Sequence, residues 1–291
     1  LAGVESTSTV TIEVTGVNDA PVITAGGDVA GTVDEDGQDA PTSVSGDLDS
    51  TDVDNGATAT WSVDGGGAGA YGDLSVDVNG TWTYDLRNGD ANVQALAATE
   101  SHDELFTIVV TDEHGATDTE TVTVTVTGTN DDPVITAGGD VAGDVQEDAT
   151  LSVSGDLDST DVDNGATAAW SVAGGGAGVY GDLSVDTDGT WTYDLRNGDA
   201  NVQALAVGET HDEVFSVVVT DDQGATDTET VTVTVTGTND APIITDGGDV
   251  AGAVQEDVTL SVSGDLDSTD VDNGATAAWS VAGGGAGVYG D

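Results

Sequence analysis

The sequence predicts an all-β protein built from antiparallel β-sandwich domains in a linear tandem array. Three observations support this fold class. Trp61, Trp170 and Trp279 recur at a spacing of 109 residues, and a period of that size indicates whole domains. Residues 154–182 recur letter for letter as residues 263–291. Within each copy, apolar and polar residues alternate over short stretches that Gly- and Asp-rich turns separate, which is typical of β-strands.

An Asn-Asp-x-Pro element divides the chain into repeats and occurs at residues 18–21, 130–133 and 239–242. Proline fixes its own φ and favours extended geometry in the preceding residue, which suits a junction between domains. We therefore expect residues 1–16 to be the last strand of a preceding repeat, residues 17–128 and 129–237 to be complete β-sandwich repeats, and residues 238–291 to be the truncated first half of a third repeat.

Alternating patterns mark the core strands of each repeat. One face of such a strand is apolar and the other polar, as a half-buried strand requires. In the first complete repeat the apolar members are Trp82, Tyr84 and Leu86, then Phe106, Ile108 and Val110, then Val122, Val124 and Val126. The only helix-compatible stretch, residues 92–97, predicts one short turn. We expect the Trp and Tyr side chains to lie in the core and not on an exposed binding surface.

Differences between the copies carry information, because repeats this similar share almost every residue. Leu105 is replaced by Val214, and Ile108 is replaced by Val217. Exchange of one aliphatic residue for another predicts a core position for both. Arg87 and Arg196 occupy equivalent places among aspartates, and we expect each to form an ion pair within its own repeat.

The chain is strongly acidic, with 56 Asp and Glu residues against 2 Lys and Arg residues and a formal net charge of −54. Nothing is available to neutralise phosphates, so nucleic acid and anionic membrane surfaces are excluded as partners. The absence of cysteine excludes disulfides and thiolate metal sites. No apolar run approaches the roughly 20 residues that span a bilayer. The expected partners are cations, bound either as discrete calcium ions or by a solvated acidic surface suited to high salt.

Acidic residues and asparagines are concentrated near the junctions. If their loops gather at one end of a sandwich, carboxylates about 4 Å apart repel by about 4 kcal/mol at an effective dielectric of about 20. Calcium takes six to eight oxygen ligands and would relieve this repulsion; the alternative is that the loops stay apart and are solvated. The candidate ligands are Asn18, Asp19, Glu35, Asp36, Asp52 and Asp54 at the first junction; Asn130, Asp131, Glu147, Asp148, Asp161 and Asp163 at the second; Asn239, Asp240, Glu256, Asp257, Asp270 and Asp272 at the third; and Asp112 or Asp221, contributed by the preceding domain.

A resemblance follows from residues 189–195 (Gly-Thr-Trp-Thr-Tyr-Asp-Leu), 202–209 and 237–242. Together they resemble the VCBS repeat of large secreted bacterial adhesins of the RTX type. The resemblance implies an immunoglobulin- or cadherin-like sandwich in the extender region of an extracellular or cell-surface adhesin. The junction is also similar to the calcium-binding linker of cadherins. Glycine stands where cadherin linkers carry an acid before the Asn-Asp pair, which implies one or two ions per junction.

The predicted function is that of a calcium-stiffened extender, or stalk, with a structural and mechanical role in cell adhesion or biofilm. Its expected partners are calcium ions and neighbouring repeats of the same chain. The alternative is a polysaccharide-binding or self-associating module that builds extracellular matrix or filaments.

We do not expect an enzyme. His102 and His211 lie beside acids, but no nucleophile motif accompanies them. The Gly-x-Gly-x-x-Gly spelling of residues 67–72 precedes a predicted strand, whereas a nucleotide site needs a helix there.

Overall fold

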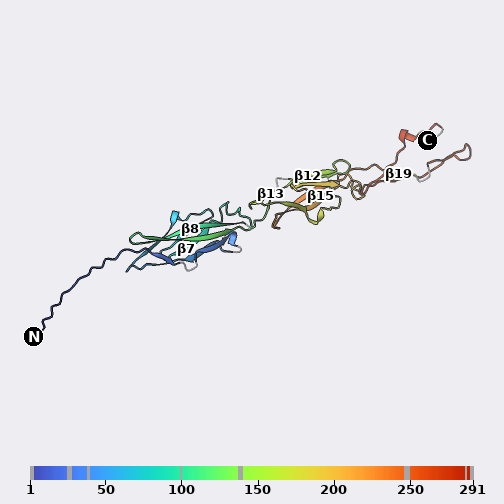
Figure 1. Cartoon of the computed structure of the whole chain (residues 1–291). Coiled ribbons are helices and arrows are strands. Elements are labelled where there is room, and N and C mark those ends of the chain that lie inside the picture. Colours follow the sequence, from blue (N-terminus) through green and yellow to red (C-terminus); the bar gives the residue numbers. More distant parts are fainter. Residues whose placement is uncertain are drawn as a thin grey trace. The chain divides into compact units, whose positions relative to one another are not determined.

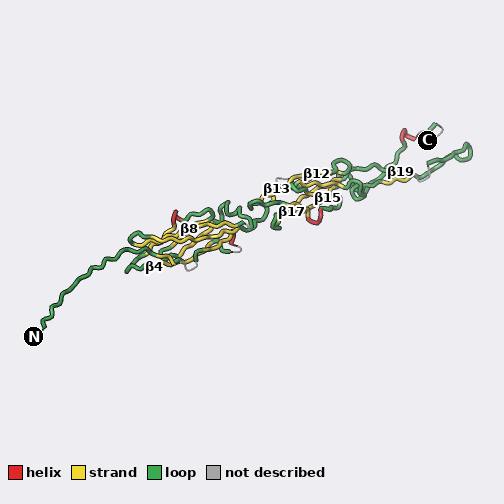
Figure 2. The backbone as a smooth tube through the Cα atoms, viewed as in Figure 1, coloured by secondary structure: helices red, strands yellow, loops and turns green. Residues whose placement is uncertain are grey.

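The structure is a computed structural model that describes residues 3–24, 28–37, 40–98, 100–136, 140–245, 250–285 and 287–288. Strands dominate it, and the only helical elements in these ranges are short 3-10 turns (Figures 1 and 2). The all-β prediction is therefore confirmed. The chain divides into two compact units, one comprising Leu1–Asp131 and Val162–Gly165, the other Asp132–Asp161 and Ala166–Asp291.

The first unit contains one complete β-sandwich. One sheet has the strand order β2-β9-β8-β5, the facing sheet has the order β3-β7-β6, and β1 pairs with β4 alone. The elements are β1 (Val22–Thr24), β2 (Ala30–Asp34), η1 (Glu35–Gly37), β3 (Ser43–Asp47), β4 (Asp49–Thr51), β5 (Ala59–Val63), η2 (Asp64–Gly66), β6 (Gly72–Val76), β7 (Thr81–Leu86), β8 (Ser101–Asp112) and β9 (Thr117–Thr127).

One strand pair departs from the antiparallel pattern that the sequence predicts. β2 pairs with β9 in parallel, from Ala30 opposite Thr123 to Asp34 opposite Thr127. All other strand pairs of this unit are antiparallel. The parallel pair is sterically accessible because the chain passes through the other sheet between β2 and β9, so no tight hairpin fixes their relative direction. As a consequence, β2 and β9 end at the same end of the sandwich.

The core confirms most of the predicted inward positions. Trp82 and Tyr84 are fully buried, and so are Ile108 and Val110. Leu105 is the exception, because its side chain is 69% exposed. In β8 the inward residues are the even-numbered ones from Glu104 to Val110, so strand alternation turns an odd-numbered residue to the outer face.

The same error affects the second repeat. Val214, the counterpart of Leu105, is 65% exposed, whereas Val217 is fully buried. The prediction that Leu105 and Val214 are core residues is wrong. Two aliphatic residues in equivalent places do not distinguish a buried face from the outer face of a strand, because both faces favour residues of high β-propensity.

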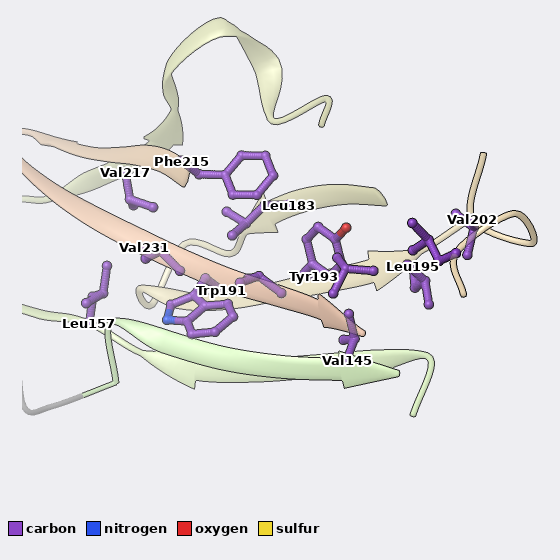
Figure 3. Packing of buried hydrophobic residues seen from close by; sticks show 13 residues of the cluster. Val145, Leu157, Leu183, Trp191, Tyr193, Leu195, Val202, Phe215, Val217 and Val231 are labelled. Carbon is purple, nitrogen blue, oxygen red and sulfur yellow. The ribbon is translucent and has the colours of Figure 1, made fainter. Parts of the chain in front are cut away.

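The second unit repeats the sandwich with the sheet orders β11-β18-β17-β14 and β12-β16-β15, and again one pair is parallel, β11 with β18. Trp191 and Tyr193 from β16 pack beside Phe215 and Leu183 in its core (Figure 3). The elements are β10 (Val134–Thr136), β11 (Ala142–Gln146), β12 (Ser152–Asp156), β13 (Asp158–Thr160), β14 (Ala169–Val172), η3 (Ala173–Gly175), β15 (Gly181–Val185), β16 (Thr190–Leu195), β17 (Thr210–Thr220) and β18 (Thr226–Thr236).

Residues beyond 237 carry few elements. β19 (Ile243–Thr245) pairs with β20 (Asp267–Thr269), and η4 (Ala282–Gly285) follows. No other strand forms among residues 250–285 and 287–288, and Trp279 is 51% exposed. Residues 3–20 likewise form no strand. Residues 1–2 and 289–291, at the outer limits of the predicted repeats, lie outside the described residues.

Candidate metal centres

The parallel strand pair positions the first carboxylate of interest. Glu35 follows the last residue of β2, and Thr129 lies two residues beyond the end of β9. The backbone N–H of Thr129 donates to Glu35 Oε2 over 3.2 Å, and Gln94 Nε2 donates to Glu35 Oε1 over 2.9 Å. The Glu35 side chain is fully buried. A carboxylate is thus held inside the end of the sandwich from which the chain leaves toward Asn130.

Two further carboxylates of the first unit act on Glu35. The backbone N–H of Asp131 donates to Asp163 Oδ2 over 3.0 Å, and Asp163 is only 8% exposed. Burial raises the pKa of Glu35 to about 7, and the charges of Asp131, Asp36 and Asp163 add to this rise. Glu35, Asp131 and Asp163 form the group that we call the middle cluster.

This grouping corrects the sequence-based one. Glu35 was expected beside Asn18 and Asp19, the junction nearest to it in sequence. It lies instead with Asp131 and Asp163. The reason is the parallel pairing of β2 with β9, which carries the end of β2 to the far end of the sandwich.

Glu100 extends the same end of the first unit and was missed by sequence reasoning. Asn164 Nδ2 donates to Glu100 Oε2 over 3.1 Å, and the backbone N–H of Asn164 donates to the carbonyl of Ala95 over 2.9 Å. Glu100 Oε1 lies 2.8 Å from His102 Nε2, and this partner contributes most to the lowered pKa of Glu100. The sequence signal that could have identified Glu100 is its place two residues before His102, at the start of the long strand β8.

The second unit contains an equivalent group, the C-terminal cluster, formed by Glu147, Asp240 and Asp272. Thr238 N–H donates to Glu147 Oε2 over 3.0 Å, and Asp240 N–H donates to Asp272 Oδ2 over 3.0 Å. Burial raises the pKa values of Glu147 and Asp240, and Asp272 adds to both effects. Asp270 Oδ1 accepts from the backbone N–H of Asp272 over 3.1 Å.

Two carboxylate oxygens in the C-terminal cluster are buried without a hydrogen-bond partner: Asp240 Oδ2 and Asp272 Oδ1. Buried polar atoms are nearly always satisfied by a partner, and an uncompensated carboxylate is costly to bury. Their position beside Glu147, whose pKa is also raised, indicates that this site is completed by a cation or by protons.

Asn18, Asp19, Asp52, Asp54 and Asp112 form the N-terminal cluster of the first unit. Asn18 Nδ2 donates to Asp112 Oδ2 over 2.9 Å, Asp19 N–H donates to Asp54 Oδ2 over 2.8 Å, and Asp54 N–H donates to Asp52 Oδ1 over 2.8 Å. A cavity of about 220 Å³ opens beside Asp52 and Asp54.

Asp112 was expected at the second junction, and the structure places it at the first. β8 begins at Ser101 opposite Thr127 and ends at Asp112 near the start of β9, so Asp112 lies at the opposite end of the sandwich from Glu35. The hydrogen bond from Asn18 is the largest cause of its lowered pKa. Its counterpart Asp221 organises the turn between β17 and β18, where Oδ1 accepts from Gln223 N–H and other turn amides.

The remaining predicted residues have other positions. Asp36 adopts a φ of 55° and exchanges two hydrogen bonds with Asn88, of 2.9 and 2.7 Å. Asp148 does the same with Asn197. The last five residues of the predicted set lie in linkers or loops. Asn130 and Asn239 donate to the carbonyls of Asp131 and Asp240. Asp161 is half-buried, and Glu256 and Asp257 are exposed.

The donor chemistry of these clusters fits a hard cation. Every predicted ligand offers oxygen, the donor that calcium prefers. Within the described residues, no group of three or more His, Cys, Asp or Glu side chains is already arranged to hold a metal ion. The buried oxygens of Asp240 and Asp272 nevertheless need a positive partner. The residues therefore fit a bound calcium ion.

Comparison with known proteins agrees with this architecture of tandem sandwiches. The family model of the bacterial cadherin-like domain matches residues 18–128 and 130–237. The chain belongs to this family. No curated protein matches the sequence. No helix in the described ranges has the length and apolar character needed to cross a membrane.

Three solved cadherin structures are similar to this chain at low sequence identity. The extracellular domain of protocadherin gamma B4 is 17% identical with a TM-score of 0.46, covering 90% of this chain and 40% of that one. PcdhgB3 EC1-4 is 16% identical with a TM-score of 0.44, covering 87% and 60%. Human CDH23 EC21-23 is 16% identical with a TM-score of 0.41, covering 75% and 64%. The chain thus spans less than two thirds of the length of each.

Proposed function

We propose that this chain is a calcium-stiffened extender segment of a secreted bacterial surface adhesin, with a mechanical role in adhesion or biofilm. Cadherin-like domains are extracellular adhesion or extender modules of a typically non-enzymatic fold. The acidic composition, with a formal net charge of −54, makes self-repulsion along such an array strong unless cations are bound. In this proposal calcium sets the stiffness of the array, and the RTX-type adhesin is the expected parent.

The observation that carries the calcium proposal is the pair of buried oxygens on Asp240 and Asp272 that have no hydrogen-bond partner. Glu147, Asp240 and Asp272 would hold the ion in the C-terminal cluster, and Glu35, Asp131 and Asp163 would hold it in the middle cluster. The chain's own part is to bring these carboxylates together through backbone hydrogen bonds from Thr129, Asp131, Thr238 and Asp240. A bound calcium would supply the positive charge that this arrangement lacks.

The alternative of a polysaccharide-binding module receives less support. An exposed aromatic platform would favour it, whereas Trp82 and Trp191 are fully buried. Trp61 and Trp170 are half-buried and pack against the same cores. The tryptophan side chains of the complete repeats therefore contribute to the cores of the sandwiches.

Scattering and calorimetry test the calcium proposal on the whole chain. We expect small-angle scattering to give a larger maximum dimension in calcium than in chelator, and titration calorimetry to show binding. Asp272→Ala should remove or weaken binding at one cluster only, because the middle cluster does not use this residue. The matched control is Asp222→Ala, an exposed acid outside all three clusters. Identical dimensions in both conditions would refute the stiffening role, and unchanged stoichiometry and affinity in Asp272→Ala would refute the ligand assignment.

A further inference from the structure

The longest strand of each sandwich has a partly unpaired edge. β8 pairs with β9 along almost its entire length, but on its other side β5 covers only Ile108 to Asp112. β17 is arranged in the same way, because β14 covers only Val217 to Thr220. Within the described residues, positions 101–107 and 210–216 therefore have no neighbouring strand on that side. An unpaired strand edge is a template for an added strand.

A groove runs along this edge in both repeats. In the second repeat a cavity of about 750 Å³ lies between residues 211–216 of β17 and the loop of residues 173–180. In the first repeat a cavity of about 380 Å³ lies between residues 102–107 of β8 and the equivalent loop. Inward and outward residues of the strand both line the groove, which places it along the lateral edge and not on one face.

The loop that forms the opposite wall of the groove is held in place by the only arginine of each repeat. In the first repeat, Arg87 donates to the carbonyls of Gly69 and Ala70 over 3.0 Å each. Its remaining donors bind Asp73 over 2.8 Å and Asp90 over 3.0 Å, which confirms the predicted internal ion pair. Arg196 makes the equivalent contacts in the second repeat.

A buried carboxylate holds the same loop from the strand side. Glu104 is 8% exposed; its Oε1 accepts from the backbone N–H groups of Ala70 and Tyr71, and its Oε2 accepts from the hydroxyl of Tyr84. Both walls of the groove are therefore formed before any partner arrives, and a preformed site loses less conformational entropy on binding.

The side chains along the edge define what can bind. Exposed residues on the outer face of β8 include Asp103 and Leu105, and those on β17 include Asp212 and Val214. An added strand pairs its residues with these, and opposite charges or apolar pairs are favourable across strands. The fitting segment carries a cationic residue opposite the aspartate and an apolar residue two positions away, because Asp103 and Leu105 lie two residues apart on the same face of β8. A second copy of this chain does not fit, because acidic residues outnumber basic ones 56 to 2.

We propose that each repeat binds an extended basic segment of a partner protein as an additional β-strand along the free edge of β8 or β17. Backbone hydrogen bonds give the affinity, as in other cases of strand addition. The exposed positions of Leu105 and Val214, which sequence reasoning assigned to the core, are then explained as the apolar contact of the groove. This inference goes beyond the extender function and does not depend on calcium.

The test uses the whole chain and the synthetic seven-residue peptide Thr-Lys-Thr-Val-Thr-Lys-Thr with blocked ends, which presents Lys, Val and Lys on one face of an extended strand. We expect two peptides per chain at about 0.15 M salt, where exposed charges more than about 8 Å apart are largely screened. A peptide of the same sequence, N-methylated at every residue, keeps its charges and loses its backbone donors. It should bind at least about tenfold more weakly, a loss of about 1.4 kcal/mol.

Two protein variants separate the groove from the general acidic surface. The double substitution Leu105→Lys with Val214→Lys places a cation at both grooves and should weaken binding about tenfold or more, a loss of about 1.4 kcal/mol. The double substitution Thr119→Lys with Thr228→Lys adds the same charge at exposed positions of β9 and β18 and should change binding by less than about twofold, or about 0.4 kcal/mol.

Three outcomes would overturn the proposal. Equal binding of the N-methylated peptide would show that charge alone attracts it. Equal weakening by both double variants would place binding elsewhere on the acidic surface. Binding of a neutral oligosaccharide such as maltoheptaose that Leu105→Lys with Val214→Lys abolishes, with no peptide binding, would assign the groove to a glycan.

Discussion

Residues 154–182 and 263–291 have the same sequence, but the described part of the second stretch differs in structure from the first. The first stretch includes most of β12 and all of β14, and its Leu157 is fully buried. In the second stretch neither strand has a counterpart within the described residues. Leu266, the counterpart of Leu157, is 41% exposed, and Trp279 is 51% exposed where Trp170 is half-buried. Local sequence is therefore insufficient to form these strands.

The elements common to both stretches show what decides the outcome. β13 and β20 form in both places, since each has its antiparallel partner, β10 or β19. The 3-10 turns η3 and η4 also form in both, because they need only local hydrogen bonds. β12 and β14 pair with β16 and β17, whose counterparts are not found among the described residues beyond 237. A strand forms where its partner is present, so the long-range partner supplies the stability.

Supplying the missing partners should remove the difference. We predict that a chain extended after Asp291 with a copy of residues 183–237 folds its third repeat. The gain is the stability of a domain, about 5–15 kcal/mol. The amides of residues 263–281 should then be as strongly protected from hydrogen exchange as those of residues 154–172.

A matched fusion sharpens this prediction. In this control fusion, the appended copy carries alanine at the two positions equivalent to Trp191 and Tyr193, and the second repeat itself is unchanged. Both side chains are fully buried in the second repeat, and their loss costs several kcal/mol of folding stability. This fusion should leave residues 263–281 unprotected. Strong protection in the original chain, before any extension, would contradict the interpretation that long-range partners decide.

Buried and exposed glutamates at equivalent positions provide the second test. Glu35 is fully buried and Glu256 is exposed. The pKa of Glu35 rises from 4.5 to about 7 on folding, so its proton stabilises the folded state below pH 4.5 and this contribution disappears as pH rises through 7. Without calcium we predict a loss of about 3 kcal/mol between pH 4.5 and 7.

Chemical denaturation in chelator at pH 5 and pH 8 measures this effect for the first repeat. Glu35→Gln keeps a neutral side chain of similar shape and should remove that part of the pH dependence. Glu256→Gln is the matched control and should leave it unchanged. If the free energy of unfolding falls equally between pH 5 and pH 8 in the wild type and in Glu35→Gln, another group causes the pH dependence.

The two equivalent tryptophans give a smaller, direct comparison. Trp170 packs against the core of the second repeat, whereas Trp279 is 51% exposed. Truncation of a fully buried Trp costs about 3–5 kcal/mol, so we expect about 2 kcal/mol for half-buried Trp170→Ala. Trp279→Ala should change stability by less than about 0.5 kcal/mol. The denaturant midpoints of the two variants measure these stability changes. Equal shifts in the two midpoints would contradict the finding that Trp170 is more buried than Trp279.

Sequence reasoning reached the fold class and most of the core because strand alternation is a local pattern. Trp82, Ile108 and their counterparts were identified from period-two spacing alone. The ends of the sandwich were harder to predict. Glu35 and Asp112 were each assigned to the wrong end, because their positions depend on the parallel pairing of β2 with β9 and on the direction of β8. No local pattern encodes such long-range pairing.

Leu105 shows a second limit of sequence-based prediction, and its substitution should give the smallest change in stability. An aliphatic residue that varies between Leu and Val satisfies the rule for a core position, yet Leu105 is 69% exposed while nearby Ile108 is fully buried. We predict that Leu105→Ser changes stability by less than about 0.5 kcal/mol. Ile108→Val removes one methylene from the core and should cost about 0.5–1.5 kcal/mol. Denaturation of both variants in calcium is the measurement. A larger cost for Leu105→Ser than for Ile108→Val would mean that the outer face of β8 is covered in solution, and the free-edge groove would then have to be sought on another strand.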